Sequence, residues 1–276
     1  MRLGGFVIHG SAAATLGACL ESLAAVCDEL VAVDSGSCDG SAELVRASGA
    51  RRVEHPWCGY GAARVAAVAA LAPCDYVFFL DSDERLLPGA VEAIRRWKES
   101  SPAAPYVRLA LRDWAELPGR RFLFRTEHRV RLVRRDHARW TPGMIVHEAL
   151  PRGPAVADLR AFIEHRFADG TEGRRARDER YALLWAVRAR VEGWPRKPAA
   201  LQRLAHTLRN GVVKGALFRG GGPGLALAWS TARYHERKYA YLASLERGEH
   251  PELVAALREG RLRELFARVE ALPLRD

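Results

Sequence analysis

The most informative segment of the chain reads Asp75-Tyr76-Val77-Phe78-Phe79-Leu80-Asp81-Ser82-Asp83-Glu84. Its five consecutive apolar residues are too few for a helix and are bounded by acids, which predicts a buried strand over Tyr76–Leu80. A strand that is buried on both faces is typical of a parallel sheet covered by helices. The acids Asp81, Asp83 and Glu84 then stand where this strand ends.

Strands and helices alternate on both sides of this segment. The expected strands are Leu3–Ile8, Glu29–Asp34 and Arg51–Glu54, and the expected helices are 15–25, 41–47, 61–71 and 88–98. This alternation predicts the α/β class, with a mostly parallel sheet flanked by helices. Ligands of such sheets bind beyond the carboxyl ends of the strands. The positions of Asp34 and Asp81 therefore predict a ligand site at that edge.

The pattern changes after residue 100. We expect strands over Tyr106–Leu111, Phe122–Phe124 and Arg129–Arg134, then helices over 174–192, 198–218, 225–247 and 252–270, with a glycine-proline break at 220–224. The prediction is a catalytic and ligand-binding domain over 1–168, followed by a basic helical extension over 169–276.

Composition supports a folded chain with an uneven charge. The 276 residues are 49% hydrophobic, and no run of 18 apolar residues occurs, which argues against disorder and against a transmembrane helix. The net charge of +10 divides into −6 over residues 1–94 and +16 over the remainder. No signal peptide is evident. The five cysteines include no C-x-x-C pair, which fits reduced thiols and a cytoplasmic location.

Two loops carry candidate ligand-binding chemistry. The acids Asp81 and Asp83 suit a divalent cation, Mg²⁺ or Mn²⁺, and the alternative is a solvated turn. Asp34 can accept hydrogen bonds from a base or ribose, and the small residues Ser35 and Gly36 permit close approach to the backbone. The alternative for the second loop is an N-capping role for Asp39 or Ser41.

Arg64 is a further candidate, because it lies on a helix that otherwise looks buried. Its charge needs a partner there, and the two possibilities are a diphosphate and a carboxylate such as Asp83.

Taken together, the motifs resemble the bacterial family 2 glycosyltransferases of GT-A fold, and within them the lipopolysaccharide core β-1,4-glucosyltransferase group. The matching pieces are Cys27–Gly40, Trp57–Gly61, Asp75–Leu86 and Val146-His147-Glu148-Ala149-Leu150, with a looser match over Gly215–Gly224 and Tyr234–Tyr239. This resemblance implies an inverting, metal-dependent transfer of a sugar from a nucleotide sugar to a glycolipid or polysaccharide of the lipopolysaccharide core or cell envelope.

The resemblance also implies a role for individual residues. Asp34 would contact the nucleotide base, Arg64 would lie near the phosphates, and Asp81 would lie at the ribose or the metal. Ser35, Gly36 and Ser82 would also belong to the nucleotide-sugar site. Asp83, Asp81 and His165 would hold the metal. Glu148 would deprotonate the acceptor, with Glu84 and Glu164 as rival bases, and His147 would orient the base or touch the acceptor; a structural histidine is the alternative.

Two positions depart from the family pattern. His9-Gly10-Ser11 stands where Asn-Glu is usual, and Val65 stands where Asn usually follows the arginine. Because of these two departures, the alternative that the chain is a catalytically degenerate, glycosyltransferase-like binding protein stays open.

The basic half is expected to meet an anionic glycolipid acceptor or the inner face of the cytoplasmic membrane. An ordinary helical hairpin packed on the catalytic domain is the alternative. A nucleic-acid-binding protein is permitted by the basic charge, but no nucleic-acid motif occurs, and we expect no nucleic-acid partner.

Overall fold

The computed structural model describes residues 1–146, 150, 155–168 and 172–273. The chain divides into two compact units. The sheet unit comprises Met1–Asp113 and Thr126–Phe167, and the helical unit comprises Trp114–Arg125 and Ala168–Asp276. The segment Trp114–Arg125, which the sequence analysis placed in the first domain, therefore groups with the helices. The predicted boundary at residue 168 stays a prediction.

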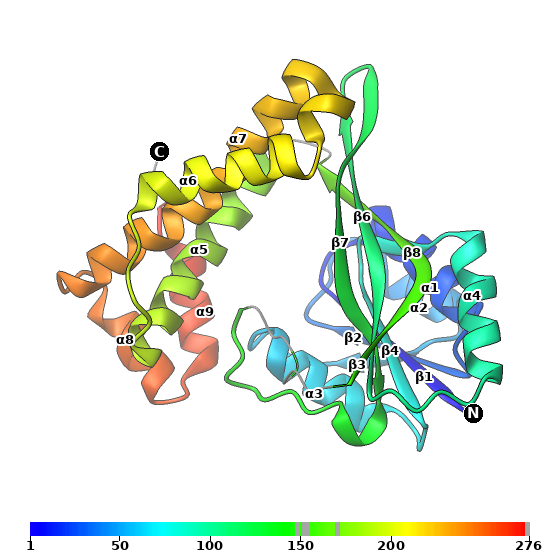
Figure 1. Ribbon diagram of the computed structural model, residues 1–276. Coiled ribbons are helices and arrows are strands. Elements are labelled where there is room, and N and C mark those ends of the chain that lie inside the picture. Colours follow the sequence, from blue (N-terminus) through cyan, green and yellow to red (C-terminus); the bar gives the residue numbers. More distant parts are fainter. Residues whose placement is uncertain (147–149, 151–154, 169–171, 274–276) are drawn as a thin grey trace. The chain divides into compact units, whose positions relative to one another are not determined.

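The first four strands form a parallel sheet in the order β3-β2-β1-β4 (Figure 1). They are β1 (Leu3–His9), β2 (Glu29–Asp34), β3 (Arg51–Glu54) and β4 (Tyr76–Asp81). In the register, His9 of β1 pairs with Asp34 of β2, and Ile8 pairs with Asp81 of β4. The carboxyl ends of these strands therefore meet at one edge, as the sequence predicts.

Successive side chains of β1 and β4 point to opposite faces of the sheet and enter two separate cores. Leu3 and Val7 of β1 join Phe78 of β4 in one core, whereas Phe6 joins Phe79 in the other. The first core also takes in α1 (Ala13–Ala24), α2 (Ser41–Ala47) and α4 (Pro88–Glu99), and the second takes in α3 (Tyr60–Ala70). Both faces of the sheet are thus covered, which explains why β4 is apolar throughout.

The sheet continues through longer strands in the order β4-β7-β6-β8-β5. They are β5 (Glu84–Leu86), β6 (Tyr106–Leu117), β7 (Arg120–Arg134) and β8 (Val156–Ala168). β4 pairs antiparallel with β7, and β5 pairs antiparallel with β8, with Glu84 opposite His165. The two separate strands predicted within 122–134 are wrong, because both segments belong to β7. β5 and β8 were not predicted at all.

The helical unit contains five α-helices among its described residues: α5 (Glu172–Glu192), α6 (Ala199–Leu208), α7 (Ala216–Glu246), α8 (Pro251–Arg258) and α9 (Leu262–Ala271). A π-helical turn, Arg209–Val213, follows α6. The predicted glycine break falls inside α7 at Gly221, whose φ of 61° and ψ of −145° are not helical. The single helix predicted over 252–270 is two helices, separated at the positive φ of Gly260.

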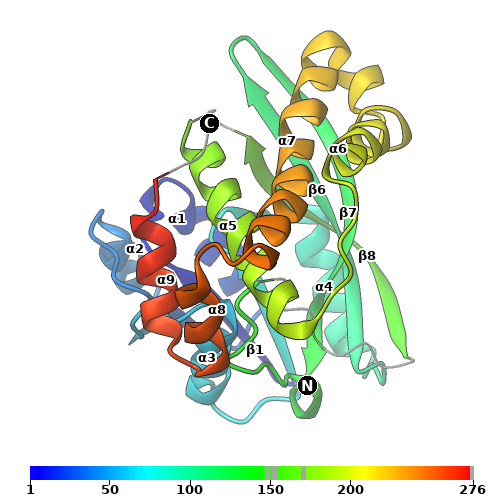
Figure 2. The same ribbon diagram turned by 90° about the vertical axis from the view of Figure 1, so that its left-hand side faces the viewer.

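A buried ion cluster joins α5 to α7. The Glu179 carboxylate is 4% exposed and accepts hydrogen bonds from Arg233, Arg237 and the Tyr241 hydroxyl. In Figure 2, α5 and α7 lie next to each other along this cluster. None of the described helices is both long and apolar enough to cross a bilayer.

A close backbone approach within the sheet unit gives a first prediction. The Gly61 amide donates to the Met144 carbonyl, and a Cβ at Gly61 would lie 2.2 Å from the Thr141 carbonyl oxygen. We expect Gly61→Ala to lower the free energy of unfolding by about 3 kcal/mol, because backbone atoms would have to move. Urea unfolding followed by circular dichroism measures this.

The matched control is Gly89→Ala, also near the start of a helix, where no atom lies within 4 Å of the added Cβ. This change should leave stability equal or raise it by roughly 0.5 kcal/mol. Equal effects of the two substitutions would contradict the close approach.

Candidate active site

Asp34 holds the loop that follows β2. One carboxylate oxygen accepts from the backbone amides of Gly36 and Ser37, and the other accepts from the Ser37 hydroxyl and from Arg52, at 2.5–3.1 Å. Burial opposes ionisation, but the hydrogen bonds from Ser37 and Arg52 outweigh it and lower the pKa of Asp34 to about 2. The carboxylate is therefore charged at neutral pH, and its acceptor positions are filled by the protein itself.

Neither Asp39 nor Ser41 is the N-cap residue of α2, although Asp39 Oδ1 accepts from the Ser41 amide, the first of the helix, at 3.2 Å. The N-cap of α2 is Gly40, which takes a φ of 84° and makes no side-chain cap. Asp39 instead accepts from the Ala13 amide and from Ser41, and the Ser41 hydroxyl accepts from the Ala12 amide. The loop is thereby tied to the start of α1.

Three polar side-chain atoms at the ends of β1, β2 and β3 have no hydrogen-bond partner among the described residues. They are His9 Nε2, Ser35 Oγ and His55 Nδ1, and all three are buried. His9 Nδ1 lies 2.9 Å from the Gly10 carbonyl oxygen and donates to it, so that Nε2 of the neutral ring is an acceptor. Buried polar atoms are normally paired, and a polar ligand at this edge would pair them. Ser35 was predicted here, whereas His9 was noted only as a departure and His55 was missed.

Asp81 and Glu84 share Arg131 of β7. Arg131 Nη2 donates to Asp81 Oδ2 at 2.9 Å and to Glu84 Oε1, and Arg64 Nη2 of α3 donates to Asp81 Oδ1 at 3.3 Å. Both guanidinium groups also lie over the ring of Phe79. Arg64 is buried, as predicted, and among its two predicted partner types the structure shows a carboxylate, that of Asp81 rather than Asp83.

The two carboxylates of this cluster differ in their protonation. Burial works against the charge of Asp81, but Arg131 and Arg64 hold its pKa far below the ordinary value. Burial raises the pKa of Glu84, and the Asp81 carboxylate adds to the rise while Arg131 partly offsets it. The Asp81 side chain is 46% exposed and that of Glu84 is 2% exposed, so that Asp81 is the one that a ligand can reach.

His165 of β8 lies between two carboxylates. Its Nδ1 is 2.7 Å from Asp113 Oδ1, and its Nε2 is 3.4 Å from Asp83 Oδ2. Burial lowers the pKa of the imidazole, but the bonds to Asp113 and Asp83 outweigh it and raise this pKa to about 10. A histidine oriented by a carboxylate through Nδ1 presents Nε2 in the manner of a metal ligand once Nε2 has lost its proton to solvent. Asp113 was missed, because its partner is 52 residues away along the chain.

The three predicted metal ligands do not converge. Asp83 and His165 face each other, whereas Asp81 turns to Arg64 and Arg131. In the described part of the chain, no group of three or more His, Cys, Asp or Glu side chains is placed to hold a metal ion. Asp83 and His165 thus form a pair that fits a divalent cation whose remaining ligands come from the substrate and water.

The predicted base falls on residues that the structure does not describe. His147 and Glu148 lie outside the described residues, between the buried residues Val146 and Leu150. The two rival carboxylates are both in ion pairs: Glu84 with Arg131, and Glu164 with Arg85 at 3.0 Å. Ser82 is half-buried between Asp81 and Asp83.

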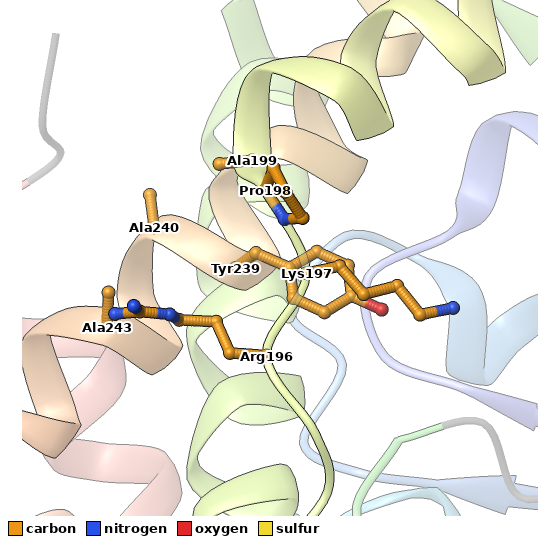
Figure 3. A pocket seen from close by; sticks show the side chains of 7 residues that line it. All are labelled: Arg196, Lys197, Pro198, Ala199, Tyr239, Ala240 and Ala243. Carbon is orange, nitrogen blue, oxygen red and sulfur yellow. The ribbon is translucent and has the colours of Figure 1, made fainter.

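The helical unit has a pocket of about 460 Å³, which the sequence did not indicate (Figure 3). It is lined by Arg196, Lys197, Pro198, Ala199, Tyr239, Ala240 and Ala243. Both charged lining residues are basic, and Arg196 also pairs with Glu246 at 3.4 Å.

The fold and the polar strand ends define an α/β protein with a candidate ligand site at one edge of its sheet, and the comparisons with known proteins give the family. The model of glycosyl transferase family 2 matches residues 7–148, just over half of the chain, and the chain belongs to this family. The predicted family, its GT-A type of α/β fold and the helical C-terminal region are confirmed.

The similarity to individual proteins covers only part of the chain or is low in sequence identity. The chain is 34% identical over 164 residues to "Lipopolysaccharide core biosynthesis glycosyltransferase LpsC" of Rhizobium meliloti (strain 1021), a match covering 55% of this chain and 58% of that one. Glucosyl-3-phosphoglycerate synthase from Mycobacterium tuberculosis, solved with Mn²⁺, uridine diphosphate and phosphoglyceric acid, is 26% identical over 40% of this chain and 43% of that chain, with a TM-score of 0.35. S. aureus TarS 1–349 is 13% identical over 98% and 90%, with a TM-score of 0.47.

The lowered pKa of Asp34 gives a second prediction. A carboxylate whose folded pKa is about 2, against an ordinary 3.8, contributes about 2 kcal/mol to the free energy of unfolding near neutral pH. This contribution is lost as the pH falls from about 4 to about 2. We therefore expect Asp34→Asn to be less stable than the wild type at pH 7, with the difference shrinking in acid.

Urea unfolding between pH 2 and pH 7 measures the difference. The exposed Glu21, substituted as Glu21→Gln, is the matched control and should follow the wild type throughout. A constant deficit for Asp34→Asn at every pH would contradict the assignment.

Proposed function

We propose that this chain is an inverting, metal-dependent glycosyltransferase. It moves a sugar from a nucleotide-sugar donor to a glycolipid or polysaccharide acceptor of the cell envelope, in lipopolysaccharide core synthesis. Family membership supports the reaction class, and the similarity to the R. meliloti enzyme supports the acceptor class. The observation that carries the proposal is the shared edge at which His9, Asp34 and Asp81 end three adjacent parallel strands.

The nucleoside binds at the ends of β1, β2 and β3. His9 Nε2 and Ser35 Oγ form hydrogen bonds with the polar groups of the base and ribose, which gives these two buried atoms the partners that they otherwise lack. Asp34 acts by fixing the backbone of Ser35 and Gly36, since its own oxygens are occupied. Asp81 and Ser82 lie at the ribose, and Arg64 lies on the phosphate side.

Asp83 and His165 would hold the divalent cation, Mn²⁺ or Mg²⁺, and Asp113 positions the imidazole. The cation, when bound, neutralises the charge that grows on the leaving nucleoside diphosphate. Arg131 keeps Asp81 and Glu84 in place beside it, which fixes the β4–β5 turn that carries Asp83.

Glu148 accepts the proton of the acceptor hydroxyl as the oxygen attacks the anomeric carbon. The bond between this carbon and the diphosphate oxygen breaks in the same displacement, on the opposite face, so the anomeric configuration inverts. His147 orients Glu148 or contacts the acceptor. The expected cytoplasmic location stays a prediction.

The cation site can be tested by nucleotide binding. Asp83→Ala should weaken the binding of uridine or another nucleoside diphosphate in Mn²⁺ at least about tenfold, since it removes a ligand, and Asp113→Asn should weaken it by roughly 10- to 100-fold. Isothermal titration with Mn²⁺ and with chelator gives both values. Asp158→Ala, an exposed acid on the same strand as His165, should bind like the wild type.

Wild-type binding that is unchanged by chelator would refute the cation site. Binding of no nucleoside diphosphate at all would refute the transferase itself.

The base can be tested by turnover. A panel of UDP-, GDP- and ADP-sugars identifies the donor by release of the nucleoside diphosphate. Glu148→Gln should lower this release by about 10²- to 10⁴-fold and leave donor binding unchanged, because no base then takes the proton from the attacking hydroxyl group. Glu164→Gln, the rival that pairs with Arg85, serves as the control and should keep turnover.

Loss of turnover in Glu164→Gln but not in Glu148→Gln would reverse the assignment. Donor binding without turnover of any sugar would identify a degenerate member of the family.

A further inference from the structure

Large hydrophobic side chains gather on the surface of one part of the helical unit. Of the ten large hydrophobic residues that are exposed among the described residues, eight lie within 201–229. They are Leu201, Leu204, Leu208, Val212, Val213, Phe218, Leu225 and Trp229, and we call them the α6–α7 apolar surface. Val213 is 78% exposed and Phe218 is 75% exposed. Such a concentration marks an interaction site rather than the scattered apolar residues of an ordinary surface.

The surface belongs to ordered helices that pack on each other. Leu201, Leu204 and Leu208 are spaced three and four residues apart and thus form one stripe along α6. Figures 1 and 2 both show α6 beside α7. Arg203 of α6 joins the two, because it pairs with Glu236 at 2.9 Å and stacks on the Trp229 ring at 3.9 Å.

The turn that presents Phe218 is fixed by backbone contacts. Arg219 donates to the carbonyl oxygens of Leu123, Phe124 and Lys214. Across the break at Gly221 the chain returns so closely that a Cβ at Gly224 would lie 2.1 Å from the Ala216 carbonyl oxygen. The exposed Phe218 is therefore held outward by a defined turn, and its exposure does not result from a frayed helix end.

The segment that carries this surface is basic. Residues 193–235 include seven Lys or Arg and no Asp or Glu, although Arg196, Arg203 and Arg233 pair with acids outside this segment. Exposed apolar side chains on helices of a basic segment are the features of a helix that lies in the interface of an anionic bilayer. Each basic residue near such a surface adds to the attraction.

We propose that the α6–α7 apolar surface docks on the surface of an anionic lipid bilayer. Val213, Phe218 and the leucine stripe enter the boundary between headgroups and acyl chains, and those basic residues of 193–235 that are not held by the protein's own acids and carbonyl groups contact the lipid phosphates. A second copy of this chain fits the surface less well, because a twofold contact would bring the two basic segments together. A nucleic acid would match the charge but would leave the apolar side chains in water.

Vesicle sedimentation of the full chain tests the proposal. The probes are phosphatidylcholine vesicles with 30 mol% phosphatidylglycerol, and vesicles of phosphatidylcholine alone, without donor or acceptor. We expect binding to the anionic vesicles that weakens in high salt, and much weaker binding to the neutral ones. Phe218→Glu and Val213→Glu should each lower the partition coefficient about tenfold or more, because each replaces an inserted apolar group with a repelled charge.

Phe162→Glu is the matched control, since Phe162 is an exposed phenylalanine of the sheet unit and its substitution should leave binding unchanged. Quenching by brominated lipid, taken as the difference between the wild type and Trp229→Phe, reports insertion directly. Equal binding of Phe218→Glu and the wild type, or no binding of the wild type, would overturn the proposal. A dimer that Phe218→Glu converts to a monomer would overturn it in favour of self-association. Because the assay needs no nucleotide, its result is independent of the transferase activity.

Discussion

The buried positive charge of Arg131 must be paired, and this requirement fixes the side chains at the edge of the sheet. Arg131 lies buried at the end of β4, over the ring of Phe79, and binds both Asp81 and Glu84. Removing one partner of such a buried pair leaves an uncompensated charge, which is costly. The β4–β5 turn, with Asp83 on it, therefore has little freedom. The exposed side of Asp81 remains open to solvent, so the same contact that fixes the turn also offers a carboxylate to a ligand.

The rest of the edge is built on the same principle of polar groups fixed in advance. Asp34 accepts hydrogen bonds from the amides of its own loop, and Asp113 orients His165 toward Asp83. The buried atoms His9 Nε2, Ser35 Oγ and His55 Nδ1, at the ends of β1–β3, have no hydrogen-bond partner among the described residues. A preorganised site of this kind binds without first breaking internal hydrogen bonds.

The helical unit follows a different logic. Glu179 and its three donors lie in its interior, while eight of its large apolar side chains are exposed within residues 201–229. The acids of the chain's first third and the basic residues of 193–235 thus serve two surfaces of different chemistry. An acidic edge suits a cation and a nucleotide, and a basic apolar surface suits an anionic lipid.

The sequence by itself determined the parallel half of the sheet, because period, length and turn chemistry act locally, and a uniformly apolar β4 flanked by acids is compatible with few folds. It also placed Asp34 and Asp81 at one edge, since parallel strands end together. Only the tertiary structure decided the partners. Arg131 reads as the exposed side of an alternating strand yet is buried, and β8 brings His165 to Asp83 and Asp113 across 82 and 52 residues. Pairings over such distances depend on packing and register, which no local pattern specifies.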